Sequence, residues 1–296
     1  MEGVTVLNAA TVRIDGCFTR ELSVPGDGPV HLLLHGFTDS ADTWRPVLAR
    51  LERAGARGVA LDLPGFGFAD PPPFDGHMFS VFDRFVDAAV RRYGAEVPVV
   101  LAGNSLGGCF TMRAAMRDLP LAGIAPVAPA GGHMAPWLRA LASRVPARVM
   151  TSKRLDGRGL PPNLTRRILT VAYARIAHAS RDAVSREQVQ LYLRHQVDGL
   201  VMLQRARIAL ALHPEILDPW DATQVTVPTH VIWGRMDRLV RSSGAVVLAG
   251  QVPGARATVL DDVGHLPQLE APDVVAEALL GLAASPGAPV ATPAAG

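Results

Sequence analysis

Short apolar runs alternate along this chain with stretches of helical character, and this alternation limits the fold more than any other feature of the sequence. The runs expected to be strands are 30–34, 58–61, 97–102, 121–128, 229–233 and 257–260. Helices are expected near 42–53, 79–93 and 109–117. Buried strands that alternate with helices form a parallel sheet covered on both faces. The sequence therefore predicts an α/β protein with a mostly parallel sheet.

The first thirty residues follow a different pattern, in which apolar and polar side chains alternate. Turn sequences interrupt this alternation at Asp15-Gly16 and Pro25-Gly26. Alternation with a period of two, broken by such turns, is typical of antiparallel strands. We therefore expect an antiparallel hairpin at one edge of the sheet.

The strand pattern is interrupted between residues 131 and 215, where the apolar residues follow helical spacing. We interpret this segment as a helical cap inserted into the α/β core. The core would then be formed by residues 1–130 and 216–284. The last stretch, 285–296, consists of Ala, Pro, Gly and a few other uncharged residues, and we expect it to be a disordered tail.

The strand expected at 97–102 leads into a glycine-rich turn, Gly103-Asn104-Ser105-Leu106-Gly107-Gly108. A G-x-S-x-G sequence between a strand and a helix is typical of a nucleophile elbow, in which a strained turn exposes the serine. The glycines remove Cβ atoms that would collide with the strand and the helix. The helix N-terminus behind the serine favours negative charge. Ser105 is therefore the candidate nucleophile.

A serine nucleophile needs a histidine base and an acid that orients it, and in this arrangement the acid precedes the histidine along the chain. Asp237 follows the strand expected at 229–233, and His265 follows the next strand, so both lie at carboxyl ends of strands, as Ser105 does. That edge of an open α/β sheet holds the active-site crevice. Asp261 and Asp262 are rival acids, but they are too close in sequence to His265 to face it easily. The predicted triad is Ser105, Asp237 and His265.

Attack by Ser105 on an acyl carbon creates an oxyanion, which needs two positioned donors. The backbone N–H of Leu106 is one candidate. The second is expected from the loop after the first parallel strand, His35-Gly36-Phe37, and we assign it to the N–H of Phe37. His35 and Asp62 are expected to be structural residues beside the crevice.

Five motifs in this order resemble those of the α/β-hydrolase superfamily, in its capped esterase and lyase-like branch. They are His35-Gly36-Phe37, Asp62-Leu63-Pro64-Gly65-Phe66-Gly67, the turn at 103–108, Trp233-Gly234-Arg235-Met236-Asp237 and Gly264-His265. The resemblance implies an α/β-hydrolase fold: an eight-stranded, mostly parallel sheet with helices on both faces and an inserted helical cap. It also implies that no metal and no organic cofactor is needed. Ser105 argues against the dehalogenases and epoxide hydrolases of the superfamily, which have an aspartate at the elbow.

The resemblance implies a serine hydrolase that cleaves carboxylic esters through an acyl-enzyme. Asn104 is similar to its counterpart in the hydrolases that cleave carbon–carbon bonds of meta-cleavage products. Those enzymes carry Trp after the catalytic His and a longer Gly-rich oxyanion loop, whereas this chain has Leu266 and Phe37-Thr38-Asp39-Ser40. Carbon–carbon cleavage is therefore the second hypothesis. Acyl transfer, cofactor-free peroxide chemistry, or a slow-turnover ligand receptor on the same fold are further alternatives.

The expected substrate is a small, largely apolar ester. Five residues close to the triad, or near the expected entrance of the cap, are candidate substrate contacts: Asn104, His133, Trp137, Leu239 and Leu266. The sequence leaves acyl length and oligomeric state open.

The net charge of the 296 residues is only +2, which gives no support for nucleic-acid binding. However, residues 131–215 hold 14 Lys+Arg against 5 Asp+Glu, while the rest of the chain holds 15 against 22. A basic cap could steer an anionic substrate towards the crevice, or it could simply be a solvated surface. Two cysteines, no evident signal peptide and no apolar run of about 18 residues lead us to expect a cytoplasmic protein without a membrane span.

Overall fold

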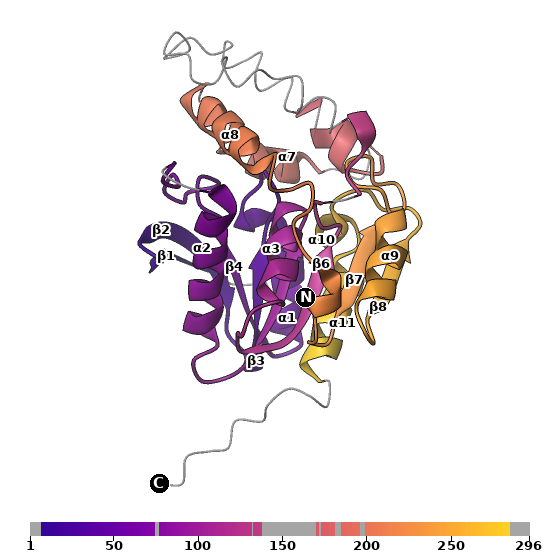
Figure 1. Cartoon of the computed structure of the whole chain (residues 1–296). Helices are drawn as coiled ribbons and strands as arrows, with labels where there is room; N and C mark the ends of the chain where they lie inside the picture. The colour runs from indigo at the N-terminus through magenta and orange to yellow at the C-terminus, as the bar shows by residue number, and fades with distance from the viewer. Residues whose placement is uncertain are drawn as a thin grey trace.

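The structure is a computed structural model, and it describes residues 7–74, 77–131, 133–137, 170–171, 173–180, 185–195 and 199–284. Eight strands form a single sheet in the order β1-β2-β4-β3-β5-β6-β7-β8 (Figure 1). The strands are β1 (Asn8–Ile14), β2 (Cys17–Val24), β3 (Asp27–Leu34), β4 (Ala56–Leu61), β5 (Val99–Asn104), β6 (Leu121–Val127), β7 (His230–Gly234) and β8 (Arg256–Leu260). All eight strands correspond to segments predicted from the sequence.

The N-terminal hairpin forms the antiparallel edge of the sheet, as predicted. β1 pairs with β2 around a turn in which Asp15 and Gly16 both have positive φ angles, 46° and 80°. β2 then pairs antiparallel with β4. From β4 to β8 all neighbouring strands are parallel, so their carboxyl ends lie along one edge of the sheet.

Helices cover both faces of the sheet. On one face α1 (Arg45–Arg53) and α11 (Pro272–Ala283) pack together, and Leu48 and Leu279 join a buried cluster with Leu33 of the central strand. On the other face lie α2 (Met78–Tyr93), α3 (Leu106–Ala114) and α9 (Ser243–Gln251). There, the rings of Phe82 and Phe110 stack with their centroids 5.0 Å apart. Because β3 is covered on both sides, its residues from Val30 to Leu34 are buried, which explains why four of these five residues are apolar.

Helical elements lie over the carboxyl edge of the strands, above the core in Figure 1. Those in the described part of 131–215 are a π-helix, Tyr173–Ala177, and two α-helices, α7 (Arg186–Leu193) and α8 (Gly199–Leu212). An isolated antiparallel bridge, Met134 with Val240, also ties this region to the core. Residues 138–169 lie outside the described part of the chain, so the boundaries of the cap stay a prediction, as does the tail at 285–296.

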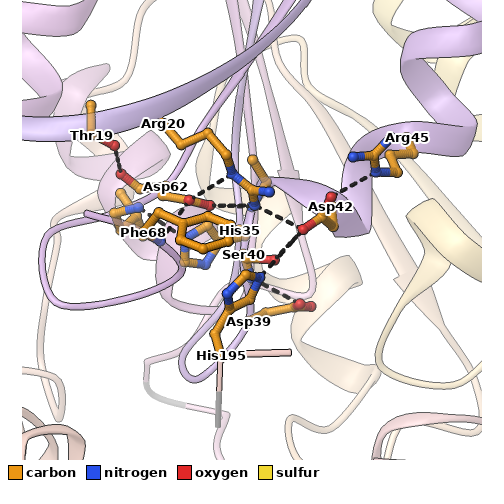
Figure 2. Close-up of polar contacts among 12 residues, drawn as sticks. Thr19, Arg20, His35, Asp39, Ser40, Asp42, Arg45, Asp62, Phe68 and His195 are labelled. Atoms are coloured by element: carbon orange, nitrogen blue, oxygen red, sulfur yellow. Dashed lines mark hydrogen bonds and ion pairs between the residues drawn. The ribbon is translucent and has the colours of Figure 1, made fainter. Parts of the chain in front are cut away.

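Side chains of the cap contact the core beside the loop that follows β3. This loop carries the candidate oxyanion donor Phe37 and is called the oxyanion loop below. His195, just after α7, places Nε2 3.5 Å from Asp42 Oδ2, and its ring meets Phe68 edge to face (Figure 2). Tyr192 of α7 lies 3.3 Å, oxygen to oxygen, from the hydroxyl of Thr38. In the part of the chain that the structure describes, no helix has the length and apolar character of a membrane-spanning segment.

Candidate active site

Ser105 lies in the turn between β5 and α3 with a strained backbone, φ 52° and ψ −109°. Two glycines allow this turn because a side chain at either position would collide with the backbone. A Cβ atom on Gly103 would lie 2.2 Å from the carbonyl carbon of Gly107, and one on Gly107 would lie 2.4 Å from the oxygen of Leu34. A non-glycine residue in such a conformation costs of the order of 1–3 kcal/mol, so the surrounding structure must hold it.

Backbone hydrogen bonds provide that support. The N–H of Ser105 donates to Val127 at the end of β6, and its carbonyl accepts from Ala130 and from Cys109 of α3, each at 2.9 Å. The turn is thus fixed to the neighbouring strand and to the following helix. The strand–turn–helix context predicted for the G-x-S-x-G sequence is confirmed.

Asp237 and His265 meet at the carboxyl edge, as the sequence predicted. His265 Nδ1 lies 2.7 Å from Asp237 Oδ2, and the side chain of Asp237 is completely buried. Asp237 Oδ1 accepts the N–H groups of Leu239 and Val240 at 2.8 and 2.9 Å, which fixes the orientation of the carboxylate. Contact at Nδ1 leaves Nε2 as the nitrogen of His265 that can take up a proton.

The rival acid Asp261 does not face His265. It forms a surface ion pair with Arg235, and its side chain is 75% exposed. Ser105 and His265 line one cavity, and among the described residues their side chains have no hydrogen bond to each other. Such contacts often close only when substrate is bound.

The backbone of His265 is held from two sides. Its N–H donates to the carbonyl of Ala177 in the cap at 2.8 Å, and its carbonyl accepts from the side-chain amide of Asn104 at 2.9 Å. Glu270 in α10 (Pro267–Glu270) joins the same loop to the cap, since its carboxylate accepts the N–H groups of Gly264 at 3.1 Å and Ala179 at 3.0 Å. Sequence reasoning missed the roles of Ala177 and Glu270, because neither contact has a short-range sequence pattern.

The two predicted oxyanion donors lie beside Ser105. Phe37 and Leu106 both line the cavity, and among the described residues neither backbone N–H donates to another group. Gly36 places this loop against the elbow, since a Cβ atom there would be 3.2 Å from Ser105 Cβ. The two N–H groups are therefore available to a ligand oxygen.

His35 is a structural residue, as expected. Its Nδ1 lies 2.7 Å from the carbonyl oxygen of Gly36, and its Nε2 accepts the N–H of Leu63 at 2.9 Å. These contacts require the neutral ring with its proton on Nδ1. Burial lowers the pKa of His35 to about 4, which agrees with that neutral form.

A buried ion-pair network lies beside the same loop (Figure 2). Arg20 bonds to Asp62 at 2.9 Å and to Asp42 at 2.8 Å. Asp62 also accepts the N–H groups of Ala41 at 2.7 Å and Phe68 at 2.9 Å. Burial alone would raise the pKa of Asp42, but hydrogen bonds from His195 and Arg20 outweigh it and lower that pKa. The structural role expected for Asp62 follows from these contacts.

The residues of the elbow, the oxyanion loop and the His265 loop enclose a cavity of about 350 Å³. Most of its wall is apolar, and the cap contributes a large part of it. The lining residues include Phe37, Leu106, Met134, Tyr173, Ile176, Tyr192, Ala209, Leu212, Ile216, Leu239, Val240 and Leu266. The polar groups that reach it include Ser105, His265, Asp39, Thr38, Asn104 and His213.

Three of the five predicted substrate contacts, Asn104, Leu239 and Leu266, line this cavity, but His133 and Trp137 do not. His133 packs against Gly244 and lines a separate pocket. The indole N–H of Trp137 donates to the carbonyl of Arg238 at 3.1 Å, and this side chain is 46% exposed. Both flank Met134, which lines the cavity, but their own side chains lie against Gly244 and the Arg238 carbonyl instead.

The described wall of the cavity holds no Lys or Arg. Nine of the fourteen basic residues in 131–215 lie outside the described part of the chain, so steering by the cap stays a prediction. The described residues also include no group of three or more His, Cys, Asp or Glu side chains arranged to hold a metal ion.

Comparison with known proteins agrees with this architecture. The chain is 29% identical over 264 residues to a pimeloyl-[acyl-carrier protein] methyl ester esterase of Xanthomonas campestris, covering 87% of this chain and 96% of the relative. It is 24% identical over 267 residues to the monoacylglycerol lipase abhd6-B of Xenopus laevis, covering 86% and 75%. Among solved structures, a meta-cleavage product hydrolase, CumD, superposes with a TM-score of 0.71 at 19% identity, covering 92% and 97% of the two chains. This last likeness concerns the fold alone.

A family model described as alpha/beta hydrolase fold matches residues 29–272, which include the elbow, Asp237 and His265. The match covers most of the chain and agrees with the observed strand order. This protein therefore belongs to the α/β-hydrolase fold family.

Proposed function

We propose that the protein is a serine carboxylesterase that cleaves small, largely apolar esters. The observation that carries this proposal is the shared apolar cavity, in which Ser105 at its strained turn lies with His265, whose ring is oriented by buried Asp237. An alcohol nucleophile, a base and two free backbone N–H groups are the parts that acyl transfer to serine requires.

In the proposed reaction, His265 Nε2 takes the proton of Ser105 as its oxygen attacks the ester carbonyl. Asp237 keeps the proton of the neutral ring on Nδ1 and stabilises the imidazolium that forms. The N–H groups of Phe37 and Leu106 stabilise the oxyanion of the tetrahedral intermediate. The imidazolium then protonates the leaving alcohol, and an acyl-enzyme remains on Ser105.

Hydrolysis of the acyl-enzyme repeats these steps with water as the nucleophile. His265 removes a proton from water, the same donors stabilise the second oxyanion, and Ser105 leaves with a proton from His265. The carboxylic acid product is released and the starting state is restored.

The cavity wall supports an acyl group that is mainly hydrocarbon. Leu106, Leu239, Leu266 and Ile216 offer apolar surface close to the triad, and burial of such surface contributes about 25 cal/mol per Å². The relative from Xanthomonas acts on a methyl ester and the relative from Xenopus is a monoacylglycerol lipase, so both names support an ester as substrate.

Ester hydrolysis is better supported than carbon–carbon cleavage. The esterase relative aligns over 87% of this chain at 29% identity, whereas the likeness to the carbon–carbon hydrolase is confined to the fold. Leu266 follows the catalytic histidine where the carbon–carbon hydrolases carry Trp.

The experiment is a panel of p-nitrophenyl and methyl esters of graded acyl length, assayed with the wild type and with Ser105→Ala. We expect multiple turnovers by the wild type, a maximum at short or medium acyl length, and a loss of at least about 10³-fold in kcat for Ser105→Ala. Ser80→Ala is a matched control, because Ser80 is exposed on α2 and is not among the described residues that line the cavity. We expect its kcat to equal that of the wild type.

The alternatives give different results in the same panel. One stoichiometric release of p-nitrophenol without further turnover would indicate a ligand receptor. Faster release on addition of an alcohol, with formation of a new ester, would indicate an acyltransferase. Equal turnover by Ser105→Ala and the wild type would contradict the proposed nucleophile.

A further inference from the structure

Arg238 follows the proposed catalytic acid in sequence, and its side chain reaches the cap. Its guanidinium donates to the carbonyl oxygens of Arg175 and of Ala179, the second at 3.3 Å. Both carbonyls belong to residues 173–180, called the cap segment below, which begins with the π-helix Tyr173–Ala177. Hydrogen bonds from a charged donor are stronger than those between neutral groups. Arg238 therefore joins the loop of the acid to the cap.

The loop of the proposed base binds the same cap segment, between these two points. The N–H of His265 donates to the carbonyl of Ala177 at 2.8 Å. Gly264 allows this close approach, because a Cβ atom there would lie 2.5 Å from the backbone nitrogen of Ala179. Three alternate residues of the cap segment, Arg175, Ala177 and Ala179, thus present their carbonyl oxygens to the loops of the acid and the base.

The orientation of the Asp237 carboxylate depends on the backbone on both sides of Arg238. Asp237 Oδ1 accepts the N–H groups of Leu239 and Val240 at 2.8 and 2.9 Å. Its other oxygen, Oδ2, lies 2.7 Å from Nδ1 of His265. A shift of the backbone at Arg238 would therefore move the carboxylate relative to the imidazole ring.

We propose that Arg238 is a positioning residue, which holds the loops of Asp237 and His265 at a fixed separation by binding the cap segment. This inference rests on the proposed ester hydrolysis and concerns the alignment of the same triad. Arg238 is not among the described residues that line the cavity, so it acts through the two loops and not on the substrate.

The cap segment is suited to this role because it also forms part of the cavity wall. Tyr173, Ile176 and Ala177 line the cavity together with Ser105. One element thus contacts both the cavity and the two loops of the triad. Its position must be fixed for a bound ester and the catalytic groups to meet in a reactive geometry.

The exposure of these groups separates an effect on catalysis from an effect on folding. Arg238 and Arg175 are exposed, and Ala179 is partly exposed. If the guanidinium is removed, water can bind the two carbonyl oxygens in its place. Water satisfies these oxygens but does not hold the loop and the cap at a fixed separation. Loss of Arg238 should therefore impair catalysis more than stability.

The first test compares Arg238→Met and Arg238→Lys with the wild type in ester hydrolysis. We expect Arg238→Met to lower kcat about tenfold to a hundredfold and to leave KM within about threefold, because misplaced catalytic groups slow the reaction without removing substrate contacts. Arg238→Lys keeps a cation for one carbonyl at a time, so its kcat should lie between the two. Arg235→Met is the matched control, because Arg235 lies in the same loop but pairs with Asp261 at the surface, and its kcat should equal that of the wild type.

Two further readouts do not depend on ester turnover. The far-downfield proton NMR resonance of the His265 Nδ1–H reports the contact with Asp237, and the rate of fluorophosphonate labelling reports the reactivity of Ser105. We expect Arg238→Met to shift or broaden this resonance and to slow labelling by a factor similar to that for kcat, with a thermal midpoint close to that of the wild type. A lower midpoint with unchanged resonance, labelling and kcat would overturn the inference, because it would show a structural role alone.

A double variant tests whether the effect passes through the cap segment. Glu270 binds this segment at the N–H of Ala179, so Arg238→Met and Glu270→Ala should affect the same element. Substitutions that act on one element are not additive. We expect the double variant to lose little more kcat than the more impaired single variant, whereas two fold-changes that multiply would overturn the shared route.

Equal kcat in Arg238→Met and the wild type would also overturn the inference. If Arg238→Met does not fold, Arg238→Gln, which is neutral and shorter than Arg, replaces it with the same expectations. Failure of the wild type to hydrolyse any ester would contradict the proposed function, while the NMR resonance and the labelling rate would still test Arg238.

Discussion

The backbone N–H of His265 donates a hydrogen bond of 2.8 Å to the carbonyl oxygen of Ala177, so the cap helps to position the proposed catalytic base. Glu270 strengthens this connection because its two carboxylate oxygens accept N–H groups from Gly264 and from Ala179. The loop that carries His265 is thus shared between the core and the cap.

Loss of the Glu270 carboxylate should impair catalysis more than binding. We expect Glu270→Ala to lower kcat by about tenfold to a hundredfold, because small displacements of a catalytic group have effects of this size. It should also lower the free energy of unfolding by about 1–3 kcal/mol through two unpaired N–H groups. Steady-state kinetics and urea unfolding measure the two effects.

The matched control for this prediction is Glu277→Ala, at an exposed position on α11. It should leave both kcat and stability at the wild-type values. A Glu270→Ala protein with wild-type kcat would show that the His265 loop does not need this link to the cap.

Asp237→Asn should leave the fold intact and reduce kcat by about 10³–10⁴-fold. The amide oxygen can still accept the N–H groups of Leu239 and Val240, but the NH₂ group would donate to His265 Nδ1. That contact favours the tautomer with its proton on Nε2, which cannot accept the proton of Ser105. Kinetics and near-UV circular dichroism check the prediction, and a decrease of less than tenfold would contradict the assigned role.

Acid should destabilise the protein through buried histidines. The pKa of His35 is lowered by burial to about 4, from a usual value near 6.5. The neutral ring is favoured in the folded state, so stability is complete above pH 6.5 and decreases as the pH falls from about 6.5 towards 4. At 1.36 kcal/mol per pKa unit, the loss is of the order of 3 kcal/mol.

Urea unfolding at pH 7 and pH 4.5 measures this loss. His35→Gln should be less stable than the wild type at pH 7, because it disturbs the contacts with Gly36 and Leu63, but it should lose less stability between the two pH values. Equal losses in the two proteins would exclude His35 as the group responsible.

Arg20 should be essential for stability, because it is the shared partner of two buried carboxylates. Arg20→Met leaves Asp42 and Asp62 without this cation, and removal of one partner from a buried ion pair costs about 3–5 kcal/mol. Arg53→Met, at an exposed position of α1, should change stability by less than about 0.5 kcal/mol. Thermal unfolding of both variants distinguishes the buried network from a general effect of losing charge.

Local sequence patterns were sufficient to predict all eight strands and the hairpin edge. The burial of a strand and the conformation of a turn both depend on residues that are adjacent in sequence. Four of the five residues from Val30 to Leu34 are apolar because β3 is covered on both faces. By contrast, α9 has no clear amphipathic pattern, since Val246 and Val247 are exposed apolar residues, and its position was not predicted.

The geometry of Ser105, Asp237 and His265 was predictable because each follows a parallel strand, and the carboxyl ends of these strands share one edge. The same reasoning could not predict which residues after β6 and in the cap contact the cavity. His133 and Trp137 were placed near the substrate by their position after β6, but only Met134 between them lines the cavity, while their own side chains have other contacts. The contacts of Ala177 and Glu270 join segments that are far apart in sequence, which spacing does not reveal.

The intact mass of the protein after reaction with a fluorophosphonate, followed by peptide mapping, tests directly whether Ser105 is the nucleophile. We expect one adduct per chain, located on Ser105, with labelling abolished in Ser105→Ala and strongly slowed in Asp237→Asn. An adduct on another residue, or undiminished labelling of Ser105→Ala, would contradict this role of Ser105.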